Sequence, residues 1–191
     1  MSYLKETQAV LNAFGKNVIA KSRGNLTRKK KIDQRGLYAA LNYEVIEDAK
    51  GFNVFFNLGD YGRFVDKGVK GADPSIIDRW TKNGKKRTGV QKAPLSPYSF
   101  KSKYPPSKKI GDWAKRKNIR LRDEKGRFVK GDYKSIGFVL SKFIYAQGIK
   151  PTYFFTNPYN AAYRRLPTQV TSAFVRDLVT MIKEKYKNKK Q

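Results

Sequence analysis

Residues 40–58 read ALNYEVIEDAKGFNVFFNL, and this stretch predicts a β-hairpin. Apolar and polar side chains roughly alternate from Leu41 to Ile46, and residues that favour strands resume from Phe52 to Leu58. The segment Asp48–Gly51 between them has the composition of a turn. Two antiparallel strands cannot bury an apolar face by themselves, so the hairpin needs helices to cover it.

Helical periodicity flanks the hairpin on both sides. An N-terminal helix is expected over residues 2–22, with Gly24 and Asn25 ending it. The last helix of the chain carries a very regular apolar stripe, which we expect to pack on the sheet. The stripe consists of Val170, Ala173, Phe174, Leu178, Met181 and Ile182.

Three shorter helices are expected between these two. Residues 61–67 stop at Gly68, residues 107–117 are capped by Ser107, and residues 133–146 stop at Gly148. Together the elements predict an α+β fold in which a small antiparallel sheet packs against an N-terminal and a long C-terminal helix.

Residues 69–105 interrupt this pattern. Gly, Pro, Ser and Lys dominate there and apolar residues stand singly, so we expect a long basic extended insertion that becomes ordered only on assembly. The chain is expected to form a single domain, residues 1–191. Its core is residues 1–68 and 106–188, and residues 183–191 form a charged tail that frays.

The chain carries 42 Lys and Arg against 15 Asp and Glu, a formal net charge of +27. Such a protein repels its own copies and is attracted to nucleic acids or acidic protein surfaces. The basic residues concentrate in residues 82–120, where Asp112 is the sole acid. The cations expected to contact DNA or a partner are Lys82, Lys85, Lys86, Arg87, Lys101 and Lys103.

The chain has neither His nor Cys. Their absence excludes the ordinary acid–base group of neutral pH, a thiolate nucleophile, a disulfide framework and a Cys/His zinc site. The glycines lack a phosphate-binding pattern. We therefore expect no catalytic residue, no cofactor and no metal site. No apolar run approaches the ~20 residues that cross a bilayer, so no membrane association is expected.

Two short motifs are expected to form corners of the core. Residues 58–68 read LGDYGRFVDKG, and Tyr61, Phe64 and Val65 are their apolar members. Residues 149–162 read IKPTYFFTNPYNAA, an aromatic segment with Phe154 and Phe155 that leads into a helix at a proline.

These motifs resemble the tail-component family of long-tailed bacteriophages, the small neck or tail-completion proteins made beside the connector. Residues 61–68, YGRFVDKG, match a family corner of the form Tyr-Ala-x-Phe-Val-Glu-x-Gly-Thr. Asp66 replaces the Glu, Gly68 is retained and Val69 replaces the Thr. Residues 154–158, FFTNP, approximate a later Pro-Phe-x-x-Pro-Ala corner that includes Pro158.

The resemblance implies a structural virion protein, assembled in the host cytoplasm. It would form a ring of roughly six or twelve copies at the head–tail junction, joining connector to tail around the DNA path. Its partners would be portal or adaptor and tail proteins, with non-specific contact to genomic DNA.

Two alternatives remain open. A ribosomal or nucleoid-like protein would use the basic insertion to bind nucleic acid as a monomer. A metal-dependent nuclease would gather the carboxylates of Asp60, Asp66, Asp73 and Asp78, although their spacing matches no recognisable nuclease pattern.

Overall fold

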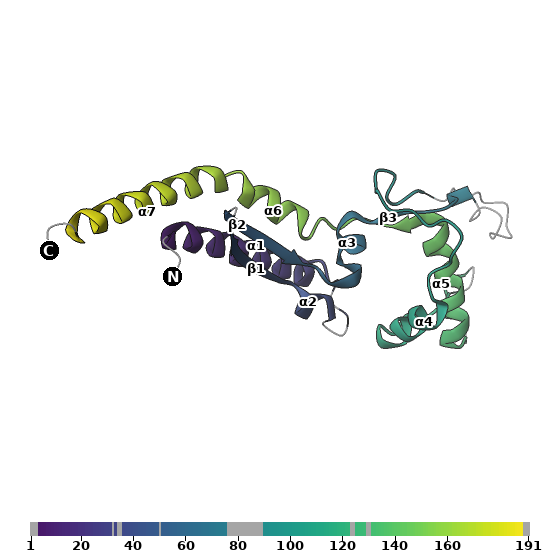
Figure 1. Cartoon of the computed structure of the whole chain (residues 1–191). Coiled ribbons are helices and arrows are strands. Elements are labelled where there is room, and N and C mark those ends of the chain that lie inside the picture. Colours follow the sequence, from purple (N-terminus) through teal and green to yellow (C-terminus); the bar gives the residue numbers. More distant parts are fainter. Residues whose placement is uncertain are drawn as a thin grey trace. The chain divides into compact units, whose positions relative to one another are not determined.

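The computed structural model in Figure 1 describes residues 4–31, 33, 36–49, 51–75, 90–122, 125–128 and 131–188. The chain divides into two compact units. The terminal unit comprises Met1–Gly62 and Tyr153–Gln191, and the central unit comprises Arg63–Thr152. The fold is α+β, which confirms the predicted class. The expected single domain, residues 1–191, stays a prediction beside this division into units.

The terminal unit contains the predicted hairpin and the two long helices. Its elements are α1 (Lys5–Arg28), α2 (Gly36–Ala40), β1 (Asn42–Asp48), β2 (Gly51–Asn57), α6 (Thr156–Tyr163) and α7 (Leu166–Asn188). The boundary between the units falls within α3 (Gly59–Lys67). The strands pair antiparallel, from Asn42 opposite Asn57 to Asp48 opposite Gly51.

One face of the hairpin packs on α1. The rings of Phe14 and Phe56 meet edge to face with centroids 5.9 Å apart. Tyr43 pairs with Phe56 in the hairpin and lies close to Gly15. A Cβ on Gly15 would overlap the Tyr43 ring. Phe155 and Tyr159 join the cluster, with centroids 5.3 and 5.9 Å from that of Phe56. These rings form the aromatic core of the terminal unit.

α1 runs past its expected end at Gly24 and Asn25, so that boundary was wrong. The helix continues because Leu26 is fully buried and the Asn25 side chain donates to the Phe154 carbonyl, 3.2 Å away. Gly24 lies on the open side of the helix, with nothing within 4 Å of a Cβ placed there.

The C-terminal segment forms two helices where one was expected. Pro167 has no N–H to donate and is tolerated only in a first turn, so it favours a new start at Leu166. α7 packs against α1 rather than laying its stripe on the sheet, with Ala173 fully buried. It also continues to Asn188, so residues 183–188 of the expected charged tail are helical.

The central unit is built on two helices that cross closely. α4 (Ser107–Arg116) and α5 (Tyr133–Gln147) meet at Gly111 and Gly137, where a Cβ on Gly137 would lie 2.9 Å from the Gly111 Cα. β3 (Val69–Lys70) and β4 (Gly148–Ile149) form a short antiparallel ladder. α5 ends at Gly148 as predicted, with φ 84°.

The caps of these two helices differ from each other. Asp132 caps α5, accepting from the Ser135 N–H at 2.7 Å. A hydrogen bond from the Ser135 side chain, together with this one from its N–H, lowers the pKa of the Asp132 carboxyl from 3.8. The expected Ser107 cap is wrong, because α4 already begins at Ser107 and Pro106 precedes it.

The described part of the insertion is extended but fixed by hydrogen bonds within the central unit. The Lys70 N–H donates to the Tyr98 carbonyl at 2.8 Å, and the Phe100 N–H donates to the Lys70 carbonyl at 3.0 Å. The Gln91 side chain bonds both the N–H and the carbonyl of Gly71. Ring contacts add to these hydrogen bonds, with Tyr98 4.7 Å from Phe64 and Phe100 6.0 Å from Tyr145 between ring centroids. The expectation that the insertion becomes ordered only on assembly stays a prediction.

Candidate interaction surfaces

α7 exposes a continuous apolar face. The side chains on it are between 38% and 68% exposed, and they recur at the spacing of one side of a helix. They are Phe174, Val175, Leu178, Val179, Ile182 and Tyr186. Isolated exposed apolar residues are ordinary, but six on one helical face mark an interaction surface.

α1 determines which face of α7 is left open. The Asp177 carboxylate, 3% exposed, accepts hydrogen bonds from the Glu6 N–H at 2.9 Å and from the N–H and hydroxyl of Thr7 at 2.8 Å each. Burial raises the pKa of Asp177, but the hydrogen bonds from Thr7 and Glu6 outweigh it, so the pKa lies below 3.8. The buried Ala173 and Asp177 therefore hold one side of α7 on α1, which directs the apolar face away from it.

α7 also extends beyond α1. Because Asp177 bonds the first turn of α1, residues 178–188 continue past the start of that helix, as Figure 1 shows. Eleven helical residues span about 16 Å. Leu178, Val179, Ile182 and Tyr186 lie on this projecting part.

The hairpin has a second open face. α1 covers the side with Tyr43 and Phe56, whereas Phe55, 55% exposed, and Ile46, 41% exposed, belong to the opposite side. Glu44 pairs with Phe55 on this outer face. Three of the 15 acids of the chain stand in β1, namely Glu44, Glu47 and Asp48. The outer face therefore presents two exposed apolar side chains among polar ones, and Glu44 and Asp48 give it negative charge.

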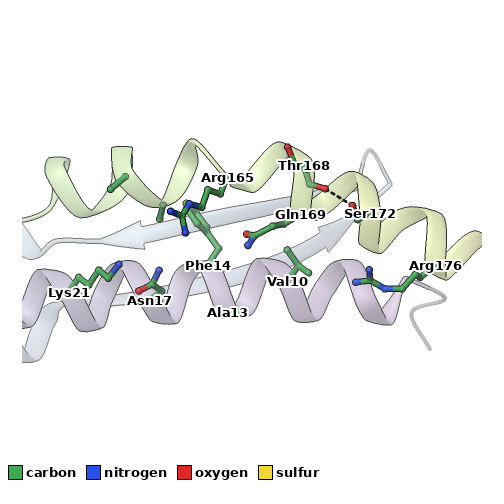
Figure 2. A pocket seen from close by; sticks show the side chains of 12 residues that line it. Val10, Ala13, Phe14, Asn17, Lys21, Arg165, Thr168, Gln169, Ser172 and Arg176 are labelled. Atoms are coloured by element: carbon green, nitrogen blue, oxygen red, sulfur yellow. Dashed lines mark hydrogen bonds between the residues drawn. The ribbon is translucent and has the colours of Figure 1, made fainter.

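A groove of about 770 Å³ lies between α1 and the α6–α7 segment. Figure 2 shows Phe14, Asn17 and Gln169 projecting into it, together with Arg165. Its charged lining residues are all cations, namely Lys21, Arg165 and Arg176, and Arg176 pairs with Glu6 at 3.5 Å. Cations with amide and hydroxyl groups suit an anionic ligand.

The predicted basic contact residues are only partly described. Lys82, Lys85, Lys86 and Arg87 lie outside the described residues. Lys101 and Lys103 are exposed on the extended segment of the central unit. The structure therefore does not place these six cations together.

The predicted corner residues divide between core and surface. Phe154 is fully buried and Pro158 is buried, whereas Val65 and Phe155 are half-buried. Tyr61 and Phe64 are exposed, so their expected place in the core is wrong. α3 is a short helix that instead buries Gly62 and Asp66.

A hydrogen bond joins the first corner motif, residues 58–68, to the start of the second, residues 149–162. The Thr152 hydroxyl donates to the Val65 carbonyl at 2.7 Å. Gly68 has φ 73°, and a Cβ there would lie 2.8 Å from the Pro151 nitrogen. Only glycine suits this positive φ and this close approach of the Pro151 backbone, so Gly68 has a structural role.

Within the described residues, no group of three or more acidic side chains could hold a metal ion. Nor, in that part of the chain, does any helix have the length and apolar character for crossing a bilayer.

The sequence pattern placed Leu178 and Ile182 in the apolar stripe of the last helix but did not reveal that both are exposed. Helical periodicity does not show which side of a helix a neighbouring element covers.

No family model, curated protein or solved structure matches the chain. The fold and surfaces define a strongly cationic α+β protein whose terminal unit has an open apolar face on α7 and a partly apolar, acidic outer face on the hairpin.

Proposed function

We propose that this chain is a structural virion protein that assembles into a closed ring at a phage head–tail junction, joining connector to tail around the DNA path. The observation that supports assembly is the open apolar face of α7. Completing the burial of six half-exposed side chains contributes about 1 kcal/mol each. That is enough to drive association, while one copy by itself leaves the face in water.

The charge of the chain sets the conditions for assembly. Each copy carries +27, so a ring concentrates positive charge and needs anions nearby. DNA in the channel, or acidic rings above and below, would supply them. Assembly is therefore expected to depend strongly on salt and on polyanions.

The test is the mass of the purified protein at low and high salt, with and without DNA, followed by imaging of any ring. We expect oligomers that the double variant Leu178→Ser, Ile182→Ser abolishes. Leu95→Ser is the matched control, because Leu95 is 92% exposed in the central unit. A wild-type protein that stays monomeric under every condition would sink the proposal.

A second candidate is a non-enzymatic nucleic-acid-binding protein. The cation-lined groove of Figure 2 favours it, because Lys21 and Arg165 could neutralise phosphates. This candidate predicts tight, salt-sensitive DNA binding by the monomer that Lys21→Gln, Arg165→Gln weakens and Leu178→Ser, Ile182→Ser leaves unchanged. Equal binding by both double variants argues against the groove.

A further inference from the structure

The terminal unit has two exposed surfaces whose apolar side chains and charges complement each other: the outer face of the hairpin and the projecting part of α7. A two-stranded sheet covered by a helix on one face only has a second face to bury. That face presents Ile46 and Phe55 beside Glu44. The projecting part of α7 presents an apolar ridge that no other element of its own unit covers.

The charges of these two surfaces are opposite. Leu178, Ile182 and Lys185 follow one another at helical spacing, so Lys185 shares the apolar face of α7. Lys183 follows Val179 by four residues and lies at the edge of the face. On the hairpin, Glu44 and Asp48 both lie on the outer face and are exposed, with Asp48 next to the turn.

We propose that α7 of one copy lies across the outer face of the β1–β2 hairpin of a second copy. This inference rests on the ring-forming function proposed above and names the contact that builds the ring. Lys183 and Lys185 of one copy then face Glu44 and Asp48 of the next. Each copy offers a different surface to each neighbour, and such head-to-tail contacts close into rings when the rotation permits.

A symmetric pairing of two α7 helices fits the charges less well. The exposed charges of α7 are mostly positive, with Arg176, Lys183, Lys185 and Lys187 against Glu184. Two such helices side by side bring like charges together in either direction, which opposes association. The acidic hairpin is the better occupant.

Charge reversal tests the contact near 0.15 M salt, where surface charges still act over about 8 Å. We expect Lys183→Glu, Lys185→Glu and, separately, Glu44→Lys, Asp48→Lys to weaken assembly at least about tenfold. An equimolar mixture of the two variants should recover it, because each α7 then meets a hairpin of opposite charge. The control Lys109→Glu, Lys115→Glu makes the same charge change on exposed positions of α4 and should assemble like wild type.

Site-specific cross-linking supplies an independent test, because the chain has no cysteine of its own. Phe55→Cys mixed with Leu178→Cys should form a mixed disulfide dimer on mild oxidation, which requires Cα atoms within about 7 Å. Leu95→Cys in place of Leu178→Cys should give no such dimer above background.

The outcomes separate this inference from the function on which it rests. If wild type assembles and the reversed variants assemble like the control, the contact is wrong and the ring proposal stands. A mixture that stays weakly assembled, or equal cross-linking by Leu95→Cys, also overturns the contact. A wild type that never assembles overturns both.

Discussion

Asp177 of α7 caps the first turn of α1 through Thr7, a residue 170 positions earlier in the chain. The residue at the start of α1, Leu4, supplies no side-chain cap. The first N–H groups of a helix need acceptors, and a carboxylate there also suits the helix dipole. One buried side chain thereby caps the start of α1 and determines which side of α7 stays exposed.

Asp177→Asn should lower the free energy of unfolding by about 1–3 kcal/mol, because a neutral amide replaces a buried, charge-assisted acceptor. Denaturant unfolding measures the change, and amide exchange of residues 5–10 localises it. Glu6→Gln is the control. Its ion pair with Arg176 is more than half exposed, so the loss should stay below about 0.5 kcal/mol.

The same carboxylate predicts a pH dependence. The folded-state pKa of Asp177 lies below its ordinary value of 3.8, so the unfolded chain binds the proton more readily. Its stabilisation is therefore complete above pH 3.8 and is lost as the pH falls through the lower folded-state pKa. The difference in unfolding free energy between wild type and Asp177→Asn should shrink on acidification. A difference that grows below pH 3.8 would contradict the assignment.

Gly15→Ala should destabilise the terminal unit by about 1–3 kcal/mol, because the new methyl group overlaps the Tyr43 ring and separates α1 from the hairpin. Gly24→Ala in the same helix has open space and should stabilise by about 0.5–1 kcal/mol. Thermal unfolding of both variants provides the comparison. Equal melting temperatures would show that the close packing is unimportant.

Gly137→Ala should destabilise the central unit by about 1–3 kcal/mol. A Cβ there would lie 2.8 Å from the Gly111 nitrogen, and backbone atoms cannot move aside without separating α4 from α5. Gly131→Ala, with nothing within 4 Å, serves as the neutral control. Amide exchange in α4 and α5 should accelerate for the first variant alone.

Ser22→Ala should raise stability by about 1 kcal/mol. In the described part of the chain, the Ser22 hydroxyl is buried without a hydrogen-bond partner, and removing it relieves a desolvation cost. Ser141→Ala is the opposite case, because that hydroxyl donates to the Pro105 carbonyl and its loss should cost about 1 kcal/mol. If Ser22→Ala destabilises instead, the hydroxyl has an acceptor in solution.

The amino-acid sequence by itself determined the local elements of this protein: the β1–β2 hairpin, the periodic helices and the stop of α5 at Gly148. Alternation, helical spacing and glycine conformation act between near neighbours, so a short window contains their cause. The tertiary structure alone decided the continuation of α1 through Leu26, the burial of Asp177 and the exposure of Leu178 and Phe55. Each of these depends on which distant segment covers a given face. The helical stripe shows that a face is apolar, and only the packing of α1 shows which part of it stays exposed.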